Sequence, residues 1–166
     1  MIKVIVSSCL LGENVRYHGG DARLDSDILA RWREEGRVVP ACPETSAGLP
    51  VPRSPAEIVG GDGTNVVKGD AYVGDRTGQD VTQTFLKGAR DTLDLAVAQG
   101  ARLAILKDGS PSCGTTYVYD GTFRGQRNPG MGVTAARLTE RGIRVFNERQ
   151  LEEAAAYLAS LESPRR

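Results

Sequence analysis

The hydrophobic and polar positions of this chain fall into short apolar runs that alternate with amphipathic stretches. The apolar runs are rich in β-branched residues, which is typical of buried strands, and they lie at residues 2–6, 37–39, 102–106 and 143–146. Because helical patterns separate these runs, we expect an α/β fold. Its sheet should be mainly parallel and open, with helices on both faces in a Rossmann-like three-layer arrangement.

The amphipathic stretches follow helical spacing and end at glycines. They lie at residues 25–35, 80–99 and 132–141, followed by a last helix from a cap at Asn147 through Leu158. The spacing of Asp80 and Gln83 predicts a capping box at the start of the second helix.

Two segments predict hairpins instead of core elements. Residues 48–78 are rich in Gly and Pro, and we expect a small hairpin insertion with arms at 65–68 and 71–73. Such a long connection is either a surface excursion or a substrate lid. The Asp-Gly pair at 120–121 predicts a tight turn within a second hairpin over 117–123.

Length, charge and composition exclude several classes of protein. The chain has 166 residues, which fits one α/β domain over 1–160 and a tail over 161–166. Lys plus Arg and Asp plus Glu both number 21, so no basic excess indicates a nucleic-acid or anionic membrane partner. No apolar run approaches the ~18 residues of a membrane span or resembles a leader, so we expect a cytoplasmic protein.

The cysteines are the most informative residues. The chain has one histidine, His18, and three cysteines, which cannot all pair with one another. Cys9, Cys42 and Cys113 each follow a predicted strand of the sheet. Because ligands of open α/β sheets bind outside the carboxyl ends of the strands, these three cysteines are expected to converge on one crevice. The alternative is that each is an ordinary buried apolar side chain.

Three converging thiolates are compatible with several kinds of site. Zinc commonly uses four ligands and CxxC pairs, and no CxxC is present. A 4Fe–4S cluster normally has four thiolates, so three would leave one iron open as a Lewis-acid position. A cysteine nucleophile would need His18 as its base, and nothing in the spacing supports that arrangement.

Residues beside the cysteines provide candidates for acid–base and binding roles. Glu44 lies two residues after Cys42, where a carboxylate can activate water, although a solvated loop carboxylate is the alternative. Ser110 and Ser112 precede Cys113 and are suited to donating hydrogen bonds, but serines also favour turns. Arg53 is a candidate substrate clamp or else a surface ion pair, and Ser8 has the same ambiguity as the other serines.

Several motifs together resemble the bacterial thiouracil desulfidase family over nearly the whole chain, from Ile2 to about Leu158. They are Ser8-Cys9-Leu10-Leu11-Gly12, Val15-Arg16-Tyr17, Cys42-Pro43-Glu44, Gly48-Leu49-Pro50, Pro52-Arg53, Lys107, Ser110-Pro111-Ser112-Cys113-Gly114, Tyr119-Asp120-Gly121-Thr122-Phe123 and Gly132-Val133-Thr134-Ala135-Ala136. No single motif is specific, but the combination is.

The resemblance implies a 4Fe–4S cluster held by Cys9, Cys42 and Cys113, with one open iron. It implies hydrolysis of a thiolated pyrimidine such as 2-thiouracil to a uracil-like product and sulfide. The family's catalytic glutamate matches Glu44, and its catalytic serine matches Ser110, with Ser112 as the alternative.

The resemblance also implies that the partners of the protein are a small thiolated base and the cluster-assembly machinery. Two further readings stay open. One is a non-catalytic iron–sulfur or metal-binding sensor or carrier. The other is a cluster-dependent sulfur transferase, although the chain lacks an SGGxDS-type pyrophosphate loop.

Overall fold

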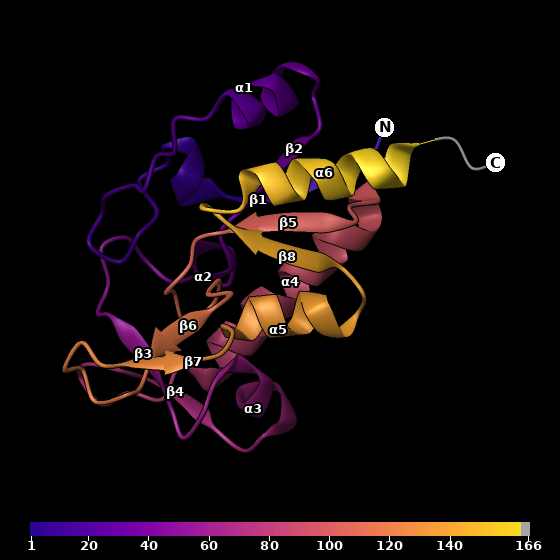
Figure 1. The fold of residues 1–166 in the computed structure, drawn as a ribbon. Coiled ribbons are helices and arrows are strands. Elements are labelled where there is room, and N and C mark those ends of the chain that lie inside the picture. The colour runs from indigo at the N-terminus through magenta and orange to yellow at the C-terminus, as the bar shows by residue number, and fades with distance from the viewer. Residues whose placement is uncertain (164–166) are drawn as a thin grey trace.

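The computed structural model describes residues 1–163, and its centre is a parallel sheet of four strands in the order β2-β1-β5-β8. The strands are β1 (Val4–Ser7), β2 (Val38–Ala41), β5 (Leu103–Leu106) and β8 (Arg144–Asn147). All three pairings in this sheet are parallel (Figure 1). The predicted α/β class and mainly parallel sheet are therefore confirmed.

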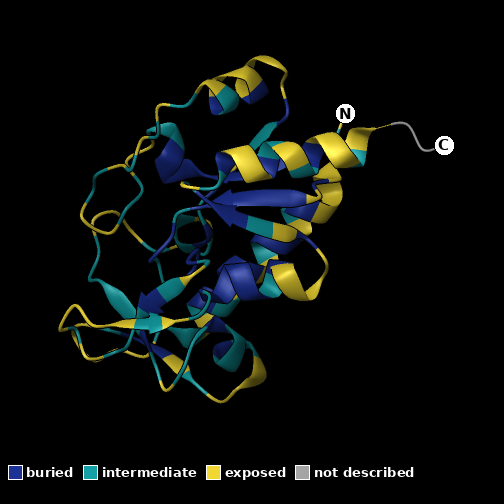
Figure 2. Cartoon of the chain, viewed as in Figure 1, coloured by how far each residue is buried: buried dark blue, intermediate teal, exposed yellow. Residues whose placement is uncertain are grey.

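Helices cover both faces of the sheet, because alternate strand residues point to opposite sides. Val4, Val6, Leu103 and Ile105 pack on the side of α1 (Asp27–Glu34) and α6 (Leu151–Glu162). Ile5, Ala104 and Leu106 pack on the side of α4 (Thr82–Gln99) and α5 (Val133–Glu140). The central strands are accordingly buried on both faces, as Figure 2 shows for β5.

The insertion between β2 and α4 differs from its prediction. The antiparallel pair is β3 (Ala56–Val59) with β4 (Tyr72–Asp75), and a helix, α3 (Gly63–Lys68), connects them. Residues 65–68, predicted as a hairpin arm, are therefore helical. A capping box between Asp62 and Asn65 starts α3, and Gly69 ends it in the left-handed conformation, so local capping overrides the β propensity of the two valines.

The second hairpin exists, but its turn is wider than predicted. β6 (Tyr117–Tyr119) pairs with β7 (Arg127–Pro129), so the connection runs over residues 120–126. The Asp120 carboxylate accepts hydrogen bonds from the amide and hydroxyl of Thr122, which holds a local turn instead of a strand. The Glu57 carboxylate from β3 accepts hydrogen bonds from the Gly121 and Phe123 amides and anchors this connection.

Some element ends also differ from the predicted ones. β2 continues beyond the predicted run at residues 37–39 and contains Pro40, which is possible because β2 is an edge strand. The predicted Asp80–Gln83 capping box is absent, since α4 begins at Thr82 and Asp80 accepts a hydrogen bond from the Thr82 amide. Asn147 is the last residue of β8, and its side chain accepts from the Arg149 amide before α6 begins.

Two short helices after strands were not predicted. A 3-10 helix, η1 (Ser8–Leu11), follows β1, and α2 (Pro43–Ser46) follows β2 with Pro43 in its first turn. A Cβ added at Gly88 of α4 would collide with the backbone carbonyl of Pro43. The glycine therefore lets α4 pack directly against α2 and holds that short helix in place.

The carboxyl-terminal helix extends further than expected. α6 runs through Glu162, two residues into the segment assigned to the tail. The rest of the predicted tail, from residue 164, lies outside the described residues.

Candidate functional site

Three cysteines follow the carboxyl ends of three neighbouring strands. Cys9 lies in η1 after β1, Cys42 is the N-cap residue of α2 after β2, and Cys113 lies in the loop after β5. β1 is hydrogen-bonded to both β2 and β5. The chain passes from β1 to β2 on one side and later to β5 on the other, and such a reversal opens a crevice outside the strand ends.

All three thiols are free, and two are almost fully buried. Burial raises the pKa of Cys9 to about 11, and the charge of Cys42 acts in the same direction. Burial likewise raises the pKa of Cys113 to about 12; hydrogen bonds from Ser7 and Ser112 oppose this rise, and the charges of Cys9 and Cys42 add to it. The three sulfurs are therefore close enough to influence one another electrostatically.

Glu44 in α2 is held by two partners from different parts of the chain. Its Oε1 accepts a hydrogen bond from Arg53 Nε at 3.2 Å, and Arg53 Nη2 also lies 3.2 Å from it. Its Oε2 accepts a hydrogen bond from the Ser112 hydroxyl at 2.8 Å. The Ser112 oxygen also lies 3.7 Å from Cys113 Sγ. The Ser112 hydroxyl therefore connects the Glu44 carboxylate to the carboxyl ends of the strands, where the three cysteines lie.

The two serines of the loop after β5 have different partners. Ser110 Oγ accepts hydrogen bonds from the backbone amides of Ser112 and Cys113, both at 3.1 Å. It also lies 2.9 Å from Ser112 Oγ. When Ser112 donates its proton to Glu44, Ser110 is the donor to Ser112, and the hydroxyls form a chain that ends on the carboxylate. Contact with Glu44 thus belongs to Ser112 and not to Ser110.

The Arg53 side chain points into the protein. Besides Glu44, it donates hydrogen bonds to the backbone carbonyls of Pro50 and Val15, at 3.0 and 2.9 Å. Its side chain is only 7% exposed. This geometry is that of a residue that holds Glu44 and two loops in place. It differs from the surface ion pair that was one of the two alternatives, and the role of Arg53 as a substrate clamp stays a prediction.

The other residues considered from the sequence have weaker links to this network. Ser8 is buried in η1, and its hydroxyl has no hydrogen-bond partner among residues 1–163. The neighbouring Ser7 instead accepts a hydrogen bond from the Lys107 amide. His18 is exposed, and its Nδ1 accepts a hydrogen bond from the Gly20 amide, so it serves as a local loop contact.

Sequence reasoning missed a buried carboxylate that shapes the cysteine loop. The Asp108 side chain is fully buried and forms an ion pair with Arg149. It also accepts hydrogen bonds from the amides of Gly109, Thr115 and Thr116 and from the Thr116 hydroxyl. Asp108 therefore closes the loop that presents both serines and Cys113. Two charged residues in succession after a buried strand, Lys107 and Asp108, were the available signal.

A second pair lies beside Asp108. Lys107 Nζ forms an ion pair with Glu148 Oε2 at 2.8 Å, and Glu148 Oε1 accepts a hydrogen bond from the Asp108 amide. Lys107 lowers and Glu148 raises the pKa of Cys9, although both effects are smaller than that of burial. This pair ties the start of the cysteine loop to the segment after β8.

The donor set of this edge fits an iron–sulfur cluster better than a single metal ion. Among residues 1–163, no three His, Cys, Asp or Glu side chains are close enough together to hold one ion. In a cluster each thiolate binds a different iron, so the sulfurs stand further apart than the ligands of one ion. Three free thiols, two of them buried, that influence one another without a histidine fit such an all-thiolate set.

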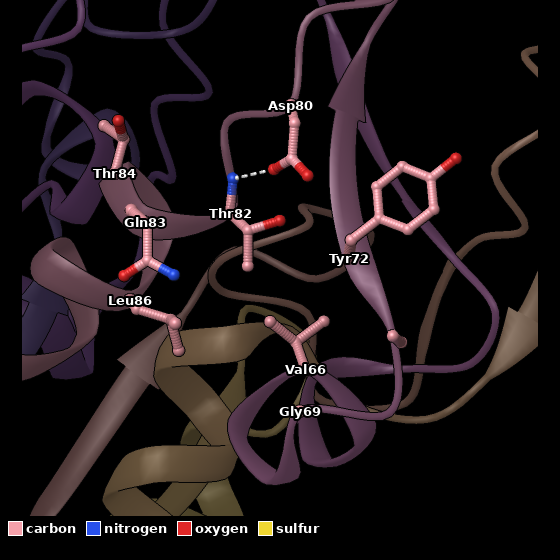
Figure 3. A pocket seen from close by; sticks show the side chains of 9 residues that line it. Val66, Gly69, Tyr72, Asp80, Thr82, Gln83, Thr84 and Leu86 are labelled. Carbon is pink, nitrogen blue, oxygen red and sulfur yellow. Dashed lines mark hydrogen bonds between the residues drawn. The ribbon is translucent and has the colours of Figure 1, made fainter.

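A shallow hollow lies elsewhere on the molecule. It has a volume of about 450 Å³ and is bordered by α3, β4 and the start of α4, with Tyr72, Asp80 and Gln83 around it (Figure 3). It contains none of the cysteines or serines described above, so it is separate from the candidate site.

Among the described residues, no helix is both long and apolar enough to cross a membrane.

Comparisons with known proteins place this chain in one family. Residues 4–150 match the family described as 2-thiouracil desulfurase. An uncharacterised protein of Bacillus subtilis (strain 168), YbbK, is 43% identical over 150 residues, which are 90% of this chain and 98% of that protein. A solved structure of the 4Fe-4S-dependent thiouracil desulfidase TudS is 44% identical, with a TM-score of 0.88, and the match covers 96% of this chain and 99% of that one.

Proposed function

We propose that this chain, which belongs to the 2-thiouracil desulfurase family, is an enzyme that removes sulfur from a thiolated pyrimidine by hydrolysis. The observation that carries the proposal is the Ser112–Glu44–Arg53 network beside three convergent cysteines. The similarity to a 4Fe-4S-dependent thiouracil desulfidase over almost the whole chain supports the same substrate class and a cluster-dependent reaction.

Cys9, Cys42 and Cys113 are the proposed ligands of a 4Fe–4S cluster. A cluster held by three thiolates keeps one iron without a protein ligand, and that iron supplies a Lewis-acid position for a soft atom such as sulfur. The Ser112 oxygen lies 3.7 Å from Cys113 Sγ while its proton is donated to Glu44, so this side chain places the carboxylate beside the third proposed ligand. Because burial raises the pKa of both Cys9 and Cys113, cluster binding releases protons from these thiols.

Glu44 is the proposed general base. Its carboxylate takes a proton from the water that attacks the thiocarbonyl carbon, while Arg53 holds its other oxygen. The C–S bond then breaks, the sulfur leaves as sulfide, and the carbon keeps the oxygen of water as a carbonyl. A thiopyrimidine and water thus give the corresponding oxopyrimidine and hydrogen sulfide, and no external oxidant or reductant is consumed.

Cluster content and turnover together test the proposal. We expect protein purified without oxygen to contain about four irons and four sulfides per chain and to release sulfide from 2-thiouracil. Replacing Cys9, Cys42 or Cys113 singly with Ser should remove both the iron and the turnover. Iron analysis and a sulfide assay measure the two quantities on the same sample.

Two controls keep that experiment decisive. Ala variants of the same cysteines, compared by circular dichroism without the cluster, separate ligand loss from loss of folding at the two buried positions. A loaded protein that binds four irons but turns over no thiopyrimidine would support the sensor or carrier reading instead. Retention of cluster and activity in any one variant would show that its cysteine is not a ligand.

The two serines are expected to differ in their effect on turnover. Ser112→Ala removes the hydroxyl that touches Glu44 and should lower kcat by about 10- to 100-fold, since hydrogen bonds to charged groups contribute about 1.5–3 kcal/mol. Ser110→Ala removes only a contact one step further from the carboxylate and should lower kcat less. Iron content must stay that of the parent in both, and a larger loss for Ser110→Ala would contradict the assignment.

A further inference from the structure

One charged residue of the site edge has no role in the mechanism above. Arg16 lies in the loop between η1 and α1, within the Val15-Arg16-Tyr17 motif. The residues on both sides of it are tied to Arg53, because the Val15 carbonyl accepts from Arg53 Nη2 at 2.9 Å and the Tyr17 carbonyl accepts from the Arg53 amide at 2.8 Å. Arg53 in turn holds Glu44.

The other end of the same loop is tied to the first cysteine. The Ala22 amide donates a hydrogen bond to the Cys9 carbonyl at 2.9 Å, and the Leu24 amide donates one to the Leu10 carbonyl at 2.9 Å. A turn closed by hydrogen bonds between Arg16 and Gly20, and between Gly19 and Arg16, shapes the middle. The loop therefore spans from the Cys9 turn to the Arg53–Glu44 pair and carries Arg16 between them.

Arg16 differs from the neighbouring cations because no group among the described residues matches its charge. Lys107 is paired with Glu148, and Arg53 is paired with Glu44. Arg16 is half-buried, and within residues 1–163 its guanidinium makes no side-chain hydrogen bond or ion pair.

A guanidinium presents several N–H donors in a planar fork and no acceptor. It is therefore suited to a planar ligand edge with acceptors, such as the ring carbonyl of an oxopyrimidine. An exocyclic amino group at the same ring position would place donors against donors and leave buried groups unpaired, which is costly. An arginine without a protein partner at this place thus selects by the group on C4 of the ring, the carbon that is separated from the sulfur-bearing C2 by one ring nitrogen.

We propose that Arg16 binds the carbonyl-bearing edge of the substrate and selects 4-oxo-thiopyrimidines over 4-amino ones. The inference rests on the proposed desulfidase function and adds to it a residue that determines specificity. Arg16 binds the ring and does not take part in the proton transfers, which belong to Glu44. Replacing Arg16 should therefore raise KM and reduce the preference for 4-oxo over 4-amino substrates, with a smaller effect on kcat.

Binding of unreactive bases gives the first test. With cluster-loaded protein, calorimetry should show tighter binding of uracil than of cytosine. Arg16→Met should weaken uracil binding by about 10- to 100-fold and change cytosine binding little, because only the carbonyl loses a charged donor. Arg16→Lys keeps the positive charge but lacks the planar fork of donors, so its affinity for uracil should lie between that of the parent and that of Arg16→Met.

Turnover gives the second test. The ratio of kcat/KM for 2-thiouracil over 2-thiocytosine should fall in Arg16→Met, mainly through KM. Arg23→Met is the matched control, since Arg23 lies in the same loop but is 71% exposed and paired with Asp25. This control should keep the parent ratio and the parent affinity for uracil.

The outcomes separate this inference from the proposed function. Unchanged uracil affinity and an unchanged substrate ratio in Arg16→Met would overturn the role of Arg16, even in an active desulfidase. Equal binding of uracil and cytosine by the parent protein, or binding of neither, would overturn it as well. Protein that binds uracil through Arg16 but releases no sulfide would retain this inference and refute the desulfidase function.

Discussion

Replacing Glu44 with Gln should lower kcat for sulfide release by about 100- to 10,000-fold, which is the usual contribution of a positioned general base. The substitution keeps the shape of the side chain and lets its oxygen still accept from Ser112 or Arg53, but the amide cannot take up a proton at neutral pH. Iron content should equal that of the parent, because Glu44 is not a proposed ligand. Steady-state sulfide release with iron analysis on the same preparation measures both.

The matched control for this variant is Glu152→Gln. Glu152 is an exposed residue in the first turn of α6, and its loss removes the same charge without touching the site. It should keep the parent kcat. If Glu44→Gln turned over at the parent rate with a complete cluster, the proposed base would have to be another group.

The second large effect is expected on stability. Asp108→Asn should lower the free energy of unfolding by about 3 kcal/mol, since several hydrogen bonds to a charged group each contribute about 1.5–3 kcal/mol. An asparagine keeps one acceptor oxygen but presents an amide toward the Thr116 hydroxyl and Arg149, which bind the carboxylate. Denaturant unfolding of the cluster-free proteins measures the difference, and loss of order in the loop should also lower iron content.

The same carboxylate should make stability depend on pH in the acid range. Burial by itself would raise the pKa of Asp108, but the hydrogen bonds from Thr116 and the contacts with Arg149 and Thr115 together hold it well below the ordinary value of 3.8. Because the folded-state pKa is the lower one, its stabilisation is present above pH 3.8 and is lost as the pH falls below that value. The Asn variant should lack this part of the acid dependence.

Asp94→Asn is the control for Asp108. Asp94 is exposed on α4, so removing its charge should change the free energy of unfolding by less than about 0.5 kcal/mol. An Asp108→Asn protein as stable as this control at pH 7 would show that the buried carboxylate does not hold the loop.

Local patterns determined most of the central fold. The β-branched runs predicted the four core strands. Helical spacing predicted α1, α4, α5 and α6, and terminal glycines marked the ends of the first three of these helices. These elements are long or strongly apolar, so burial reinforces their local preference. The capping signal of Asp62 and Asn65 was equally local, and it was the β propensity of Val66 and Val67 that led to the wrong prediction for α3.

The sequence by itself also determined the cysteine edge. The position of Cys9, Cys42 and Cys113 after three strands of a parallel sheet requires them to share one side, because all strand ends of such a sheet point the same way. Their number and the single histidine restricted the chemistry of the site before any contact was known.

Only the tertiary structure decided which neighbouring side chains work together. Ser112 and Glu44 are separated by 68 positions, and their 2.8 Å contact follows from the packing of the β5 loop against α2. Long-range contacts of this kind leave no periodic trace in the sequence. The same holds for the inward direction of Arg53, the buried hydrogen bonds of Asp108 and the unmatched charge of Arg16, because each depends on which partners the fold brings within a few ångströms.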